Sequence, residues 1–184
     1  MKAAATISAL ALVGLAAGAV HAAHHAKKEG VKQATIEFID RESKPVGTGT
    51  LTESPHGVLI SLDLHGLPPE TKAIHIHSVG TCADPADGFV ASKGHLNPDG
   101  KEHGLMNPAG PDAGDLPNLV VQQDGTVQVE LFTMLASLSG AEGRANLLDE
   151  DGAAMVIHTA RDDHITQPIG GAGARIACGV IKAQ

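Results

Sequence analysis

Apolar and polar side chains alternate along four short segments of this 184-residue chain. A period of two places every second side chain on one face, as in a β-strand with one buried face. The apolar positions of the four segments are Ile36 and Phe38; Val58, Ile60, Leu62 and Leu64; Val127, Val129 and Leu131; and Ile176, Cys178 and Val180. The pattern therefore predicts half-buried strands in all four segments.

Turns that contain glycine separate the predicted strands. Asp124-Gly125 and Asp151-Gly152 stand between apolar runs, where glycine supplies the positive φ that tight antiparallel hairpins need. The chain has no convincing, sustained helical period, which favours an all-β sandwich or barrel. Residues 80–117 are rich in Gly, Pro, Asp and Asn. A connection of that length is more typical of a functional loop than of a plain connector.

The N-terminus has the three-part pattern of a secretory signal. Lys2 precedes an apolar stretch, which ends in the small residues of Val20-His21-Ala22. We predict a signal peptide over residues 1–22, a His- and Lys-containing tail over residues 23–33, and a single domain over residues 34–184. The alternative is an uncleaved membrane anchor, but Ala and Gly make the stretch only weakly hydrophobic.

The net charge limits the classes of partner. The formal charge is −8, and loss of Lys2 with the signal makes it one unit more negative. A nucleic-acid partner is therefore not expected. No membrane partner is expected after the signal is removed. An anionic substrate would be repelled at long range, so a site for one needs a local positive group.

The chain contains two cysteines, Cys82 and Cys178. In an exported protein an oxidising compartment favours one disulfide between them. The alternative is a pair of buried free thiols.

Histidines and carboxylates form the strongest chemical signal. In Ile74-His75-Ile76-His77 the strand period puts both imidazoles on one face, where they either bind a metal or face solvent. Further candidates occur in the irregular segment and in a later apolar run. They are His95, His103, Asp112, Asp115 and His158. Imidazole suits copper and zinc, and zinc also accepts carboxylates, so the set predicts a site for these metals.

The order of these motifs resembles the copper/zinc superoxide dismutase family, in its bacterial exported branch, over residues 34–182. The matching pieces are His75-Ile76-His77, Gly80-Thr81-Cys82, Gly94-His95-Leu96-Asn97-Pro98, His103-Gly104, Gly114-Asp115-Leu116-Pro117-Asn118, His158 with Asp162-Asp163, and Gly173-Ala174-Arg175-Ile176-Ala177-Cys178-Gly179-Val180. The resemblance implies an eight-stranded Greek-key β-barrel with long metal-binding and active-site loops.

The resemblance also implies one copper and one zinc per subunit. The copper ligands would be His75, His77, His95 and His158, and the zinc ligands would be His95, His103, Asp112 and Asp115. His95 would bridge the two metals. At position 112 the family has a histidine, so Asp112 is a departure, and zinc would then be held by two imidazoles and two carboxylates or would bind more weakly.

The implied reaction is the dismutation of superoxide to oxygen and hydrogen peroxide, an antioxidant activity in the periplasm or outside the cell. Arg175 would attract and orient the anion, and His95 would pass a proton. Asp162 would join His75 to His103 through their second ring nitrogens. The alternative function is a non-catalytic periplasmic copper or zinc buffer on the same fold. The protein would be a monomer or a homodimer.

The remaining histidines fall outside this pattern. We expect His56, His65 and His164 to be surface or turn residues, of which His164 could border the active-site mouth. A mature start of Ala23-His24-His25 would place an imidazole at the third position, where it could hold Cu(II) in a square plane with the amine and two amides. An ordinary polar tail is the alternative.

Overall fold

The computed structural model describes Met1 and residues 32–184. The predicted signal peptide, nearly all of the predicted tail and the candidate Cu(II) site at the N-terminus lie outside these residues. The strands of the described part are β1 (Gln33–Asp40), β2 (Pro45–Ser54), β3 (Gly57–Leu64), β4 (Glu70–Lys72), β5 (Ile74–His77), β6 (Leu119–Val121), β7 (Val127–Thr133), β8 (Ala136–Ser137), β9 (Ala145–Asn146), β10 (Ala154–His158) and β11 (Arg175–Ala183). Its helical residues form two short 3-10 turns, η1 (Val90–Ser92) and η2 (Ala141–Gly143).

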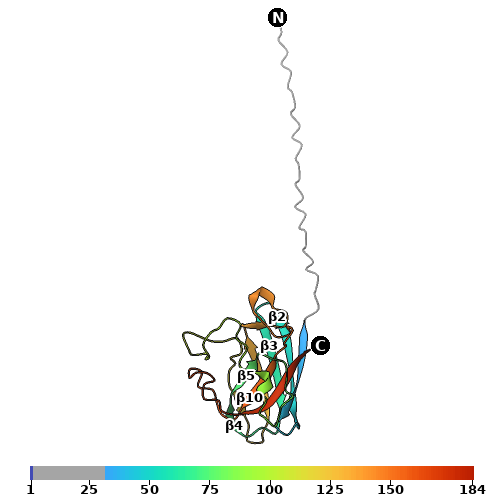
Figure 1. Cartoon of the computed structure of the whole chain (residues 1–184). Coiled ribbons are helices and arrows are strands. Elements are labelled where there is room, and N and C mark those ends of the chain that lie inside the picture. Colours follow the sequence, from blue (N-terminus) through green and yellow to red (C-terminus); the bar gives the residue numbers. More distant parts are fainter. Residues whose placement is uncertain (2–31) are drawn as a thin grey trace.

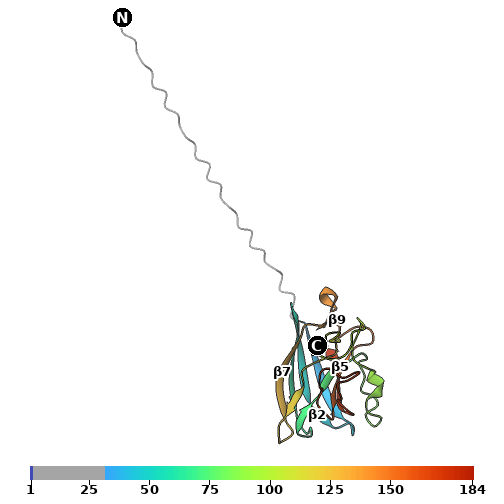
Figure 2. The same ribbon diagram turned by 90° about the vertical axis from the view of Figure 1, so that its left-hand side faces the viewer.

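Seven strands form one curled sheet in the order β5-β10-β11-β1-β2-β3-β7 (Figure 1 and Figure 2). The pair β4 and β6 links the two edges of this sheet into a circuit of strands. At one edge β4 continues into β5 after Ala73, and at the other β6 turns directly into β7. With β4 and β5 counted as one bent strand, the circuit has eight members, which confirms the predicted barrel. The strands β8 and β9 form a small separate parallel pair.

The predicted alternation is confirmed in the first half of the chain. Side chains on one face of β1 and β3 are buried in the main core, among them Ile36, Phe38, Val58, Ile60 and Leu64. The neighbouring polar side chains of these strands are exposed or half-buried. Burial of these aliphatic side chains is the main stabilising contribution to such a barrel.

For the last strand, the prediction chose the wrong face as the one that enters the core. In β11 the residues that enter the main core are Ala177 and Ile181, with Ile176 packing at its edge. Cys178 instead lies on the outer face, in a small cluster with Phe89, Ala154 and Val156. The outer face of β11 is buried because the loop after β5 covers it, so alternation alone could not tell which face is the core.

Both predicted glycine turns are present, but neither joins two strands that pair with each other, since β6 pairs with β4 and β7 pairs with β3. Gly125, with a φ of 82°, makes a tight turn between β6 and β7, where Gln122 donates a backbone hydrogen bond to Thr126. Asp151-Gly152 is also a turn, and it likewise does not join paired strands, because β9 pairs with β8 whereas β10 pairs with β5 and β11. The apolar runs on either side of this turn therefore belong to different parts of the fold.

Two long loops lie together on one side of the barrel (Figure 1 and Figure 2). One is the irregular segment between β5 and β6, and the other runs between β10 and β11. They are joined by hydrogen bonds from the backbone N of His103 to Gln167 Oε1 and from Met106 N to His164 O. A disulfide between Cys82 and Cys178 fastens the first loop to β11, as predicted.

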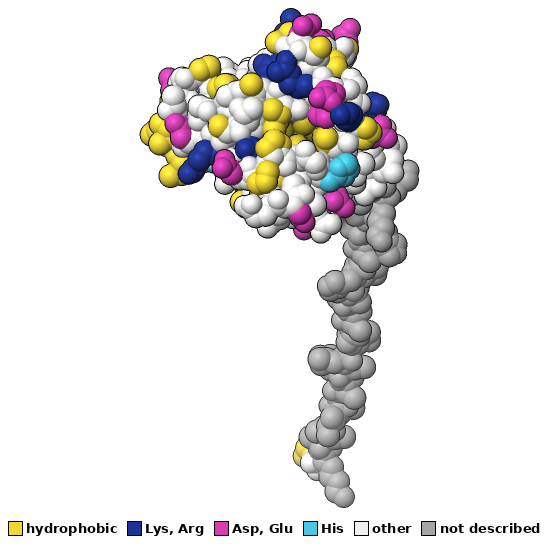
Figure 3. Space-filling view, turned by 90° about the horizontal axis from the view of Figure 1, so that it is seen from below, with side chains coloured by type: hydrophobic (Ala, Val, Ile, Leu, Met, Phe, Trp, Pro, Cys, Tyr) yellow, Lys and Arg dark blue, Asp and Glu magenta, His cyan; other side chains and the backbone are white. Residues whose placement is uncertain are grey.

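The surface carries mixed charges. Figure 3 shows acidic and basic side chains interspersed over one face, with very little histidine exposed there. His56 and His65 are exposed, as expected. Among the described residues, no helix has the length and apolar character needed to cross a bilayer.

Candidate metal centre

Three of the predicted ligand histidines lie on two adjacent strands. His75 and His77 alternate on β5 with Ile74 and Ile76, whose side chains enter the core. The register of β10 against β5 places Val156 opposite His75. His158 lies two residues beyond Val156, and its backbone N donates to Ala73 O at 2.9 Å. All three imidazoles therefore lie on the outer face of the sheet, beneath the two loops.

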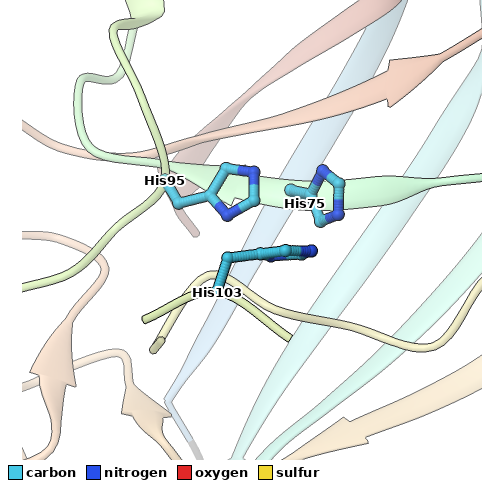
Figure 4. A group of neighbouring side chains, drawn as sticks. All are labelled: His75, His95 and His103. Atoms are coloured by element: carbon cyan, nitrogen blue, oxygen red, sulfur yellow. The ribbon is translucent and has the colours of Figure 1, made fainter. Parts of the chain in front are cut away.

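The fourth histidine, His95, comes from the loop after β5 (Figure 4). This loop runs back along β5 and forms a bridge between His95 and His77. It can approach closely because Gly114 lacks a side chain: a methyl group there would overlap the carbonyl of Ile76. The ring centroids of His75 and His95 are 4.1 Å apart, and those of His75 and His158 are 5.0 Å apart.

Each of these four imidazoles has one buried nitrogen without a hydrogen-bond partner. The four atoms are His75 Nδ1, His77 Nε2, His95 Nε2 and His158 Nε2. A buried polar atom without a partner costs about 1–3 kcal/mol, so four of them in one cluster need an explanation. A bound cation with a preference for imidazole nitrogen removes this cost, and copper and zinc both have that preference.

A second group of donors lies directly beside the first. His95, His103, Asp112 and Asp115 each offer one ligand atom, and these atoms lie within 4.8 Å of one another. His95 Nδ1 is 3.0 Å from Asp112 Oδ2 and 3.5 Å from Asp115 Oδ1, and His103 Nδ1 is 2.5 Å from Asp115 Oδ1. Two imidazoles and two carboxylates form a donor set that zinc accepts. His95 is the residue shared by the two groups.

Asp162 lies between the two groups. Its Oδ2 accepts a hydrogen bond from His75 Nε2 at 2.9 Å, and its Oδ1 accepts one from His103 Nε2 at 3.1 Å. The carboxylate is fully buried. Such a contact fixes the ring orientation of both histidines and directs their other nitrogens, His75 Nδ1 and His103 Nδ1, toward the ligand groups.

Three of the four histidines of the first group favour the neutral form in the metal-free protein. Burial lowers the pKa of His77 to about 2, with help from the nearby charge of Arg175. Burial also lowers the pKa of His158 to about 3 and shifts the pKa of His75 downward. Neutral imidazole is the form that binds a metal ion, so these three residues need not lose a proton to do so.

The second group behaves in the opposite way. Burial alone would lower the pKa of His103, but hydrogen bonds to Asp115 and Asp162 outweigh it and raise that pKa to about 10. The pKa of His95 is raised in the same way by Asp112 and Asp115. Burial opposes ionisation of Asp115 and Asp162, yet hydrogen bonds from the histidines hold the pKa of both carboxyls well below the ordinary range. A cation that enters this group therefore replaces protons.

A cavity of about 430 Å³ leads from solvent to the two groups of donors. It is lined by ligand candidates from both groups, including His77, His95 and His158, and by the positive side chains of Lys101 and Arg175. The guanidinium of Arg175 donates to the carbonyls of Phe89 and Lys93 at 2.7 and 2.6 Å, which hold it beside the histidines. A second hollow, on the outer surface of β2, β3 and β7, is lined by none of these histidines.

Sequence reasoning missed the surroundings of Asp162. His164 lies at a bend of the loop between β10 and β11, in keeping with the expected turn, and its side chain is 18% exposed. Its Nδ1 lies 3.5 Å from Asp162 Oδ2, and its Nε2 accepts a hydrogen bond from Asn118 at 3.0 Å. Asn118 also bonds both the backbone N and the backbone O of Asp162. The motif that ends in Asn118 was noted, but a single sequence does not show that it reaches the loop after β10.

The fold and the two ligand groups agree with a comparison against protein families. Residues 46–181 match the family model described as copper/zinc superoxide dismutase. The chain belongs to this family. Copper and zinc are the metals of the family, and the unpartnered nitrogens and the neighbouring carboxylates described above fit them.

Curated relatives cover most of the chain. A copper/zinc superoxide dismutase of Caulobacter vibrioides is 49% identical over 142 residues, which are 77% of this chain and 80% of the relative. One from Aquifex aeolicus is 45% identical over 82% of this chain and 86% of the relative.

Solved structures of the family have the same fold. The crystal structure of a SOD-like protein from Bacillus subtilis superposes with a TM-score of 0.74 at 42% identity, covering 79% of this chain and 96% of that one. The Cu/Zn superoxide dismutase from Brucella abortus superposes with a TM-score of 0.65 at 28% identity, covering 82% and 99%. The chain therefore shares the barrel of these two proteins over nearly the whole length of each solved chain.

Proposed function

We propose that this protein dismutates superoxide, converting two superoxide anions and two protons into one oxygen and one hydrogen peroxide. The observation that carries the proposal is the cluster of four unpartnered imidazole nitrogens beside an arginine in a cavity. A redox metal held by such a cluster can reach an anion that enters the cavity. Family membership supports the same reaction.

The two groups of donors divide between the two metals. His75, His77, His95 and His158 would hold copper through the four unpartnered nitrogens. His95, His103, Asp112 and Asp115 would hold zinc, so His95 would serve both metals through its two nitrogens. Copper prefers the set of four nitrogens, whereas zinc accepts the mixed set. Bound copper supplies one-electron chemistry, taking an electron from one superoxide and giving one to the next.

Arg175 would attract and orient the anion. The protein carries a formal charge of −8, which repels superoxide at long range, so capture depends on a local positive potential. The guanidinium provides it at the cavity wall, and its hydrogen bonds to Phe89, Ser92 and Lys93 keep it from turning away. Lys101 adds a second positive charge on the same wall.

His95 would handle a proton. Its Nε2 lies in the cluster and its ring lines the cavity, so this atom can hold a proton near a bound anion and deliver it to the product. The second ring nitrogen remains in contact with Asp112 and Asp115, which keeps the imidazole in place during the transfer.

Metal content and activity measured on the same sample test the function. Near-stoichiometric copper and zinc with rapid dismutation are expected, and they would show that Asp112 serves in place of histidine. Copper and activity without zinc would mark a copper-only enzyme. Bound metal without dismutation would contradict the proposal and would support a metal buffer instead.

Substitution of Arg175 by glutamine is expected to lower kcat/KM about tenfold, within the range that electrostatic steering contributes to association rates. The rate of the variant should also respond less to added salt, because screening has less attraction to remove. Arg175→Lys keeps the charge and should retain more of the rate. Arg161→Gln, at an exposed position in the loop before β11, is the matched control. An unchanged rate and salt response in Arg175→Gln would rule out the steering role.

The cellular location is proposed from two features. The disulfide fits an oxidising compartment, and the first 22 residues have the pattern of a signal peptide, so the protein would act in the periplasm or outside the cell. Mass spectrometry of the exported protein should give an N-terminus at Ala23. A start at Met1 would contradict cleavage. We propose a monomer or a homodimer as the functional form.

A further inference from the structure

Each histidine of the copper group has its second ring nitrogen bound to an oxygen of this chain. His77 Nδ1 donates to Lys93 O at 2.8 Å, and His158 Nδ1 donates to Gly173 O at 3.1 Å. His75 Nε2 donates to Asp162 Oδ2, as described above. Ligand histidines are usually held in this way, because the hydrogen bond fixes both the tautomer and the direction of the metal-binding lone pair.

His95 has the same arrangement, and its acceptor is Asp112. The carboxylate Oδ2 lies 3.0 Å from His95 Nδ1. The other oxygen, Oδ1, accepts the backbone N–H of Gly114 at 2.9 Å, so the carboxylate cannot turn away from the ring. With its Nδ1 proton on the side of Asp112, His95 keeps Nε2, its buried nitrogen without a partner, for the metal.

We infer that Asp112 takes over from zinc as the partner of His95 when the second site is empty, so that the copper site is complete without zinc. This inference rests on the proposed function and extends it: Asp112 has two roles, as a zinc ligand and as a hydrogen-bond acceptor for a copper ligand. The carboxylate accepts the Nδ1 proton that zinc would otherwise displace. It is therefore a positioning residue for copper.

The position of Asp112 explains why a carboxylate can serve both purposes. Asp112 is buried, with a side chain only 4% exposed, so its hydrogen bond to His95 is shielded from water. A hydrogen bond to an ionised acceptor is about twice as strong as one between neutral groups. Asp115 Oδ1 lies farther from His95 Nδ1, at 3.5 Å, and is closer to His103. Asp112 is thus the nearer acceptor for His95.

The test uses the full chain with all metal removed and zinc excluded. Half an equivalent of Cu(II) is added, the affinity is measured against a competing chelator, and electron paramagnetic resonance reports the number of nitrogen ligands. The zinc-free wild type is expected to bind copper with a four-nitrogen signal. Asp112→Asn should bind it about 10–100-fold more weakly, which is the usual cost of losing the acceptor behind a ligand histidine.

Asparagine is the most informative substitution for Asp112 because its side chain has nearly the same shape as that of aspartate. Its amide oxygen can still accept from Gly114 N, but it then presents an N–H donor to His95 Nδ1, where an acceptor is needed. Asp99→Asn removes the same charge at an exposed position of the same loop and should change copper affinity less than twofold. Equal copper affinity in Asp112→Asn and the wild type would overturn the inference.

A measurement on the wild type alone tests the inference even if the Asp112→Asn variant does not fold. Proton–nitrogen spectra of the imidazoles in the metal-free protein should show the His95 proton on Nδ1. A proton found only on Nε2 would also overturn the inference. The two proposals fail separately. If the protein dismutates superoxide when it holds zinc but cannot retain copper when zinc is absent, only the role of Asp112 is contradicted. If the metal-loaded protein does not dismutate superoxide, the proposed function is contradicted.

Discussion

Replacing Cys82 and Cys178 with alanine is expected to lower the free energy of unfolding by about 4–5 kcal/mol, because the disulfide closes a long loop in the unfolded chain. The two residues are 96 positions apart in the sequence. For a domain of this size the loss corresponds to a fall in melting temperature of roughly 10–20 °C. Thermal unfolding of the metal-free protein measures it. Alanine is preferred to serine because Cys178 is fully buried among apolar side chains.

The disulfide should also affect catalysis. It fastens the loop whose residues Phe89 and Lys93 hold the guanidinium of Arg175, so the variant should lose part of its activity even below its melting temperature. Treatment of the wild type with a reducing agent should reproduce both losses, and the alanine variant should not respond to the same treatment. A melting temperature within about 3 °C of the wild type would show that the bond contributes far less than its loop length predicts.

Gly170→Ala is expected to weaken metal binding about 10–100-fold, because it displaces the carboxylate behind two candidate ligand histidines. A methyl group on Gly170 would overlap Asp162 Oδ1 and would come within 3.0 Å of His103 Nε2. Asp162 would have to move, and His75 and His103 would then lose their common acceptor. Copper and zinc affinities measured by chelator competition test the effect.

The neighbouring glycine provides a matched control. Gly170 and Gly171 both have a positive φ, 58° and 71°, so alanine at either position has a similar backbone cost of about 1–2 kcal/mol. At Gly171, however, an added methyl group meets no atom within 4 Å. Gly171→Ala should therefore reduce stability but leave metal affinity within about twofold to threefold of the wild type. Equal metal affinities in the two variants would show that Asp162 is not needed for binding.

Part of the barrel could be predicted from the sequence because strands such as β1 and β3 bury one face only. Ile36 and Phe38 alternate with polar residues, and the same period places His75 and His77 on one side of β5. The alternation failed at β11, since Cys178 is buried on the outer face by a loop. A pattern of buried positions records only that a side chain is covered and does not record which element covers it.

The candidate site was harder to predict because its parts come from distant segments. The ligand candidates could be named from their residue types and from the family resemblance, and their roles remain proposals. The hydrogen bonds that orient them could not be foreseen: the backbone carbonyls of Lys93 and Gly173 carry no sequence signal, since any residue supplies a carbonyl. The contact of His164 with Asn118 could not be foreseen for a similar reason, because only the fold brings these two distant residues together.

In the structure the second ring nitrogens of the four candidate copper histidines bond to oxygens of this chain, two of them carboxylate oxygens and two backbone carbonyl oxygens. The order of maturation follows from this arrangement. The imidazoles are oriented as soon as the strands pair and the loops settle, so folding and formation of the disulfide need not wait for copper to arrive. We therefore expect newly made protein to accumulate in a folded, metal-free form when copper is scarce. Copper that is supplied later would then convert this protein to active enzyme without new protein synthesis.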